Sequence, residues 1–257
     1  MLRLLWALAI PIVCCPVDLP KLQLFLLIGQ SNMAGRGTVE PEDKQPIPHV
    51  FALNKDGEWV PAIDPVHFDK PKLAGVGIAR TFGRVLAATD PAVSIGLIPA
   101  AVGGTSLDQW KPGGELYEDA VRRAKIAMKS GKLRGILWHQ GESDGGDAEK
   151  ANSYGERWAA MIRQLRSDLN EPDVPVVVGE LAERAGELPK GQAFVPKVNE
   201  QLALLPLRVS RTAFASSAGL TTLADHAHFD ARSQRELGRR YALAFLSLDP
   251  SWPMPRN

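Results

Sequence analysis

Short apolar runs alternate with segments of helical periodicity along most of the chain, and this alternation constrains the fold. Residues 22–28 form a nearly continuous apolar run that ends at Gly29, which is typical of a strand buried on both faces. Strands that alternate with helices predict right-handed crossovers and a parallel sheet covered on both sides. The expected fold is therefore α/β, a three-layer α/β/α sandwich. The other predicted strands are 49–53, 93–98, 133–138, 175–178 and 208–213, and helices are predicted within 78–86, 116–128, 158–169, 195–205 and 237–248.

Composition excludes several classes of protein. The chain has 257 residues, of which 45% are hydrophobic and 23% charged, as expected of a globular protein. Lys and Arg total 30 against 29 Asp and Glu, so the net charge of +1 argues against a nucleic-acid partner. No apolar run long enough to span a membrane follows the N-terminus, so no integral membrane span is expected in the mature chain.

The first fifteen residues have the composition of a signal peptide. Arg3 is followed by an apolar stretch that ends at Cys14 and Cys15. We expect residues 1–15 to be removed and 16–257 to form a single domain, secreted or periplasmic. The alternative is a buried or membrane-tethering segment. After cleavage no cysteine would remain, so disulfides and cysteine ligands are not expected.

Four polar segments follow predicted strands or precede the last helix. Ligands of parallel α/β sheets bind beyond the carboxyl ends of the strands. We therefore expect the chemistry to come from these loops. They are Gly-Gln-Ser-Asn-Met-Ala-Gly at 29–35, Ala-Val-Gly-Gly-Thr-Ser at 101–106, His-Gln-Gly-Glu-Ser-Asp at 139–144 and Asp-His-Ala-His-Phe-Asp at 225–230.

These loops contain the groups that acyl transfer needs. A nucleophilic serine requires an imidazole within hydrogen-bond reach, and a carboxylate holds that imidazole in one tautomer. Asp225 and His228 are three residues apart, so one turn can bring the carboxylate to the ring. An oxyanion needs fixed N–H donors. The predicted donors are the backbone N–H groups of Ser31 and of Gly103 or Gly104, together with the side-chain amide of Gln140.

On these blocks the sequence resembles the SGNH-hydrolase superfamily, and within it the carbohydrate esterases of the sialate O-acetylesterase and acetylxylan-esterase type. The blocks occur in the family's order from residue 29 to 228. The resemblance implies a flavodoxin-like fold and hydrolysis of acetyl esters on a carbohydrate, with no cofactor and no metal. It implies Ser31 as nucleophile, His228 as base and Asp225 as its orienting acid. Gln140 replaces the superfamily's usual asparagine, as in the carbohydrate-esterase branch.

A second serine motif is the main competing interpretation of the site. Residues 141–145 match the G-x-S-x-G elbow and follow a predicted strand, so Ser143 is an alternative nucleophile of an α/β-hydrolase. An Asp three residues before the His is atypical of that fold, and Asp-Gly-Gly is a poor start for the helix that should follow. These features favour Ser31.

Histidines 226 and 228 with Asp230 suggest a second alternative, a metal cluster. Zinc sites of this kind need further ligands, and no histidine follows residue 228. We interpret Asp230 instead as the N-cap of the last helix.

Five further residues are candidates for supporting the site or contacting substrate: Gln30, Asn32, His139, Glu142 and Trp110. Glu142 is also an alternative to Asp225 as the acid. Trp110 could stack on a sugar ring or pack in the core. Two other functions stay open. The first is a broad-specificity esterase, lipase or thioesterase, and the second is a carbohydrate-binding relative without activity.

Overall fold

The computed structural model describes residues 21–182 and 191–252, which form an α/β fold around a seven-stranded sheet. The sheet order is β3-β2-β4-β1-β5-β6-β7, and all neighbours are parallel except the β2–β3 pair. The strands are β1 (Leu22–Gly29), β2 (Val50–Leu53), β3 (Trp59–Pro61), β4 (Ile95–Pro99), β5 (Gly131–His139), β6 (Val176–Gly179) and β7 (Thr212–Ala215).

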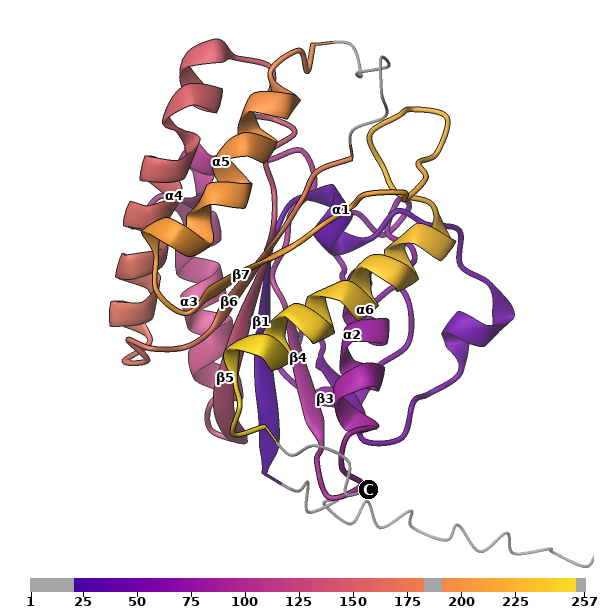
Figure 1. Ribbon diagram of the computed structural model, residues 1–257. Helices are drawn as coiled ribbons and strands as arrows, with labels where there is room; N and C mark the ends of the chain where they lie inside the picture. The colour runs from indigo at the N-terminus through magenta and orange to yellow at the C-terminus, as the bar shows by residue number, and fades with distance from the viewer. Residues whose placement is uncertain (1–20, 183–190, 253–257) are drawn as a thin grey trace, which may run out of the picture.

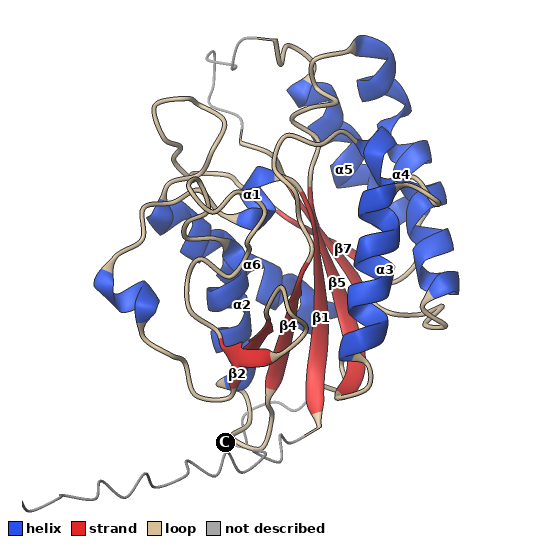
Figure 2. Cartoon of the chain, turned by 180° about the vertical axis from the view of Figure 1, so that it is seen from behind, coloured by secondary structure: helices blue, strands red, loops and turns tan. Residues whose placement is uncertain are grey.

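Helices cover both faces of this sheet, as Figures 1 and 2 show from opposite sides. The predicted three-layer α/β/α architecture is confirmed. Helices α2 and α6 lie on one face, and α3, α4 and α5 lie on the other. The helices are α1 (Ser31–Ala34), α2 (Ile78–Ala87), α3 (Glu115–Ala127), α4 (Ala148–Asp168), α5 (Val195–Arg208) and α6 (Ala231–Leu248), with short 3₁₀ turns η1 (Pro41–Lys44) and η2 (Leu107–Trp110).

The central strand β1 is buried on both faces and divides the core in two. Alternate side chains of a strand point to opposite faces. Phe25 accordingly packs edge-on against Phe82 of α2 and Phe245 of α6. Trp138 of β5 lies on the other side, where its ring meets that of Trp110. The apolar run at 22–28 thus serves both layers, which explains why it lacks the alternation of a half-exposed strand.

Three features differ from the predictions or lie beyond them. The last strand starts at Thr212, because Arg208 still belongs to α5. Strand β3 occupies a stretch expected to be irregular, where it pairs antiparallel with β2 at the sheet edge. The predicted signal peptide lies outside the described residues. Within the part of the chain that the structure describes, no helix has the length and hydropathy of a membrane span.

Candidate active site

Loops from the carboxyl ends of the strands meet at one edge of the sheet and enclose a groove of about 250 Å³. Block 29–35 follows β1, block 101–106 follows β4, and block 139–144 follows β5. The loop 216–230 reaches the same edge after β7. The groove is lined by Gln30, Ser31, Arg36, Lys70, Leu73, Gly103, Gly104, Glu142, Ser143, Gln192, Ala227 and His228.

Ser31 owes its position to the close approach of β1 and β5. It is the first residue of α1 and comes two residues after Gly29, whose φ is 133°. A Cβ at Gly29 would lie 2.1 Å from the carbonyl oxygen of His139, so a side chain there would push the strands apart. The turn therefore aims the Ser31 hydroxyl into the groove.

His228 joins Ser31 and Asp225 in one hydrogen-bonded chain. Its Nε2 lies 2.9 Å from Oγ of Ser31, and its Nδ1 lies 2.6 Å from Oδ2 of Asp225. The other oxygen of Asp225 accepts the N–H groups of Ala227 and His228. Partial burial raises the pKa of Asp225, but these hydrogen bonds outweigh it, so its pKa lies below the usual value. The carboxylate is thus held ionised beside the ring.

Asn32 ties the loop that carries His228 to the rest of the site. Its Nδ2 donates to Oε1 of Glu142 at 2.7 Å and to the carbonyl oxygen of Ala227 at 2.9 Å. Its Oδ1 accepts the N–H of Phe229. The fully buried side chain therefore fixes three segments that are far apart in sequence. This contact pattern makes Asn32 a positioning residue.

Glu142 is the second carboxylate of the groove, and it is only 4% exposed. Burial raises its pKa, although its hydrogen bond from Asn32 and the charge of His228 act in the opposite direction. Its Oε2 is buried and has no hydrogen-bond partner among the described residues. Since Nδ1 of His228 bonds to Asp225, the geometry favours Asp225 over Glu142 as the orienting acid.

The structure corrects the expectation for Gln140. Its side chain is fully buried, and Nε2 lies 2.7 Å from Oδ2 of Asp144, 3.0 Å from the carbonyl oxygen of Thr105 and 3.2 Å from Oε1 of Gln30. Its Oε1 accepts the hydroxyl of Tyr154. Both amide N–H bonds are thus engaged, and none is left for an oxyanion. Gln30, and not Gln140, lines the groove.

Gly103 and Gly104, the two glycines of the second block, differ in whether their backbone N–H is already hydrogen-bonded. The N–H of Gly103 donates to Oδ2 of Asp69 at 2.8 Å, so Gly103 does not supply the free donor that we predicted for Gly103 or Gly104. The same oxygen forms a 2.7 Å ion pair with Arg36. Gly104 has a φ of 82° and an exposed backbone, and no acceptor among the described residues bonds its N–H. Gly104 is therefore the glycine whose N–H remains available.

Trp110 and His139 are parts of the core. Trp110 is 1% exposed, and its Nε1 donates to the hydroxyl of Thr105, so of its two predicted roles the geometry supports packing in the core. His139 is fully buried with Nδ1 2.9 Å from the hydroxyl of Tyr241. Burial lowers the pKa of His139 to about 3, which keeps the ring neutral.

The competing motifs receive little support from the geometry. Ser143 lines the groove, but the imidazole of His228 bonds to Ser31 instead. Asp230 accepts the N–H of Ser233 and caps α6, as predicted. Within the described ranges, 21–182 and 191–252, no three His, Cys, Asp or Glu side chains gather as a metal site.

Asp69 and Asp144 were missed by sequence reasoning. Asp69 accepts the N–H of Gly103, and Asp144 accepts the amide of Gln140, which in turn donates to Gln30. Asp69 lies in a proline-rich stretch without periodicity, which contained no signal for it. Asp144 is contiguous with the third block, and this position was a usable signal.

Comparison with known proteins shows which family the chain resembles. The family model described as "Carbohydrate esterase, sialic acid-specific acetylesterase" matches residues 21–247. A probable carbohydrate esterase of Arabidopsis thaliana is 36% identical over 249 residues, covering 89% of this chain and 92% of the relative. A solved Arabidopsis thaliana structure superposes with a TM-score of 0.81 at 33% identity, covering 89% of this chain and 99% of that one. NanS shares the fold, with a TM-score of 0.72 at 17% identity over 90% of this chain and 98% of its own.

Proposed function

The chain belongs to the carbohydrate esterase family of the sialic acid-specific acetylesterase type and is a carboxylic ester hydrolase; from this premise we propose that it removes O-acetyl groups from a carbohydrate by a serine mechanism. The observation that carries the proposal is the unbroken chain of hydrogen bonds from Ser31 through His228 to Asp225, at the wall of the groove. That order of side chains matches the needs of nucleophilic catalysis.

In the first step Oγ of Ser31 attacks the acetyl carbonyl carbon, while Nε2 of His228 takes the hydroxyl proton. Asp225 accepts the hydrogen of Nδ1, so Nε2 of the neutral ring is left free to act as the base. As the tetrahedral intermediate collapses, the imidazolium returns the proton to the departing sugar oxygen. Water then attacks the acetyl-enzyme with the same histidine as base, releasing acetate and restoring Ser31.

We assign three donors to the oxyanion: the N–H of Ser31, the N–H of Gly104 and the side-chain amide of Gln30. All three residues line the groove. Oε1 of Gln30 accepts from Gln140 at 3.2 Å, which supports an orientation with Nε2 toward the groove. No acceptor among the described residues bonds this Nε2 or the N–H of Ser31. Donors fixed before reaction stabilise developing negative charge most effectively.

The size and lining of the groove favour a small acyl group rather than a long one. Its volume is about 250 Å³ and ten of its twelve lining residues are polar or glycine, with Leu73 and Ala227 as the aliphatic ones. An acetyl group needs little apolar surface, whereas a fatty acyl chain needs an extended apolar trough. This lining disfavours the lipase and thioesterase alternatives. The assembled Ser31, His228 and Asp225 disfavour a binding protein without activity.

The substrate is tested by measuring acetate release from O-acetylated sialic acid and from acetylated xylan in parallel. We expect turnover of one or both at a rate well above that of p-nitrophenyl decanoate. The Ser31→Ala protein, with an unchanged thermal midpoint, is the matched control. Release of decanoate faster than acetate would contradict the carbohydrate proposal, and binding of both sugars without any release would support the non-catalytic alternative.

A further inference from the structure

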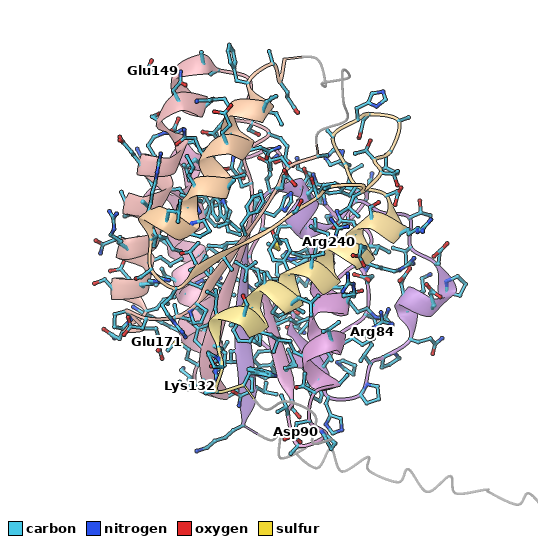
Figure 3. The ribbon with its side chains drawn as sticks, viewed as in Figure 1. Arg84, Asp90, Lys132, Glu149, Glu171 and Arg240 are labelled. Atoms are coloured by element: carbon cyan, nitrogen blue, oxygen red, sulfur yellow. The ribbon has the colours of Figure 1, made fainter. Side chains whose placement is uncertain are left out.

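A second groove, of about 580 Å³, lies between α2 and α6 and is rich in arginine. Figure 3 shows Arg84 and Arg240 on the same side of the molecule, over α2 and α6. The residues that line it are Thr81, Arg84, Val85, Gly219, Leu220, Thr221, Arg232, Ser233, Arg235, Glu236, Arg239 and Arg240. Five of these side chains are cationic and one is anionic, although the whole chain has a net charge of only +1.

Acidic partners neutralise this groove only in part. Arg239 and Arg240 share the single carboxylate of Glu236, at 2.8 and 3.0 Å. Arg84 and Arg232 are exposed and form no ion pair with any described residue.

The carboxylates beside the groove are already engaged. Asp230 accepts the Thr221 hydroxyl and the Ser233 N–H, and its negative charge offsets part of the charge of Arg232. Arg235 is paired with Asp43 and Glu40 and adds little free charge. The four arginines Arg84, Arg232, Arg239 and Arg240 therefore face two carboxylates, Glu236 and Asp230, and present a surplus of positive charge.

The cations form an array, which fits an extended ligand. Arg232 and Arg239 are seven residues apart on α6, about 10 Å along the helix and on the same face. Arg84 comes from the facing helix α2. A single phosphate or sulfate could reach one part of this array, whereas a chain with repeated anionic groups could contact all of it. Guanidinium groups match planar carboxylates with two parallel hydrogen bonds.

The groove adjoins the loop that positions His228. Its wall at Thr221 is hydrogen-bonded to Asp230, and the next residue, Thr222, forms a bridge with Phe229. The N–H of Leu223 donates to the carbonyl oxygen of His228 at 2.7 Å. A ligand held in the groove would therefore lie against the segment that carries the catalytic imidazole.

We propose that this groove binds an acidic oligosaccharide, a chain of carboxylate-bearing sugars such as uronates. That the ligand is a carbohydrate rests on the proposed function. That it carries repeated negative charges rests on the array of arginines in the groove. No aromatic side chain among the described residues lines the groove, which disfavours single-stranded nucleic acid, because its bases need stacking surfaces. The same absence disfavours a neutral sugar chain held by ring stacking.

The test is isothermal titration of the full chain with hexagalacturonate, and with neutral xylohexaose and hexathymidylate for comparison. The decisive variant is Arg84→Ser combined with Arg232→Ser. Its matched control is Arg122→Ser combined with Arg163→Ser, since both control residues are exposed on α3 and α4 across the sheet and the change in charge is equal. Thermal midpoints of both variants establish that they are folded.

We expect hexagalacturonate to bind in a salt-dependent manner, with roughly tenfold weaker affinity in the Arg84/Arg232 variant and no change in the control. Equal affinity of wild type and Arg84/Arg232 variant would overturn the proposal. Equally tight binding of xylohexaose, or of hexathymidylate, would also overturn it. Because no hydrolysis is measured, failure of the esterase assay would leave this result unaffected, and the two proposals can fail separately.

Discussion

The amide of Gln140 donates to Oε1 of Gln30 at 3.2 Å, so a buried glutamine orients a second glutamine that faces the groove. The N–H groups of Gly141 and Ser143 also point at this oxygen, at 3.4 Å each. The two glutamines therefore take different tasks, one structural and one directed at substrate, and two predictions separate them.

Replacing Gln30 with Ala removes the amide that we place at the oxyanion. The oxyanion is a stronger acceptor than the carbonyl from which it forms, so the loss should fall on kcat more than on KM. We expect kcat to drop by about 10²–10³. Steady-state kinetics on p-nitrophenyl acetate will measure this, and a rise in KM with kcat unchanged would contradict the assignment.

Replacing Gln140 with Ala should mainly lower stability. The change removes one hydrogen bond from each of three buried groups: the carboxylate of Asp144, the carbonyl oxygen of Thr105 and the hydroxyl of Tyr154. A hydrogen bond contributes about 0.5–1.5 kcal/mol to stability, and one to a charged group about 1.5–3 kcal/mol. Urea unfolding should therefore show a reduced free energy of unfolding. An unfolding free energy equal to that of wild type, combined with a large loss of kcat, would restore Gln140 as the oxyanion donor.

Ser31→Ala and Ser143→Ala distinguish the two candidate nucleophiles. We expect Ser31→Ala to lose on the order of 10⁶ in kcat, because the imidazole then has no hydroxyl to activate. Ser143→Ala should retain most activity, since its hydroxyl is not bonded to His228. Acetate release from both variants provides the comparison, and an inactive Ser143→Ala beside an active Ser31→Ala would reverse the assignment.

Asp225→Asn tests which carboxylate orients the base. Asparagine can hold the ring in the wrong tautomer, and the loss in kcat should be about 10³–10⁴. Glu142→Gln should cost much less, because its amide oxygen can still accept from Asn32. Rates for both variants at the pH of maximal activity decide the question. The result that would favour Glu142 is a larger loss for Glu142→Gln than for Asp225→Asn.

Asp64 should make stability depend on pH. It is 3% exposed, and burial together with the charge of Asp43 raises its pKa to about 7. The folded state therefore keeps a proton that the unfolded chain releases near pH 4. The stability from this group is complete below about pH 4 and is lost as the pH rises to about 7.

Asp64→Asn removes this titration. Its free energy of unfolding relative to wild type should therefore increase between pH 5 and pH 8, by at most about 3 kcal/mol. Urea unfolding of both proteins at several pH values will measure the difference. A difference that is constant across this range would refute the raised pKa.

The sequence alone predicted the layers of the fold and the central parts of the site. Buried strands such as 22–28 are visible because they are apolar and short, and helices such as α4 because their apolar residues recur at helical spacing. Asp225 and His228 could be paired because their contact is local. Strand β3 was missed because an edge strand depends on its partner more than on its own composition.

Only the tertiary structure decided which N–H groups face the groove. Gln140 and Gly103 have the residue types expected of oxyanion donors, but the amide of Gln140 donates to Asp144 and Thr105, and the N–H of Gly103 donates to Asp69. Asp69 comes from a segment outside the four polar segments, and no periodicity marks it. A hydrogen-bond donor has a fixed capacity, and a buried partner uses it before substrate arrives. Local sequence shows which groups can donate, whereas packing determines which of them remain free.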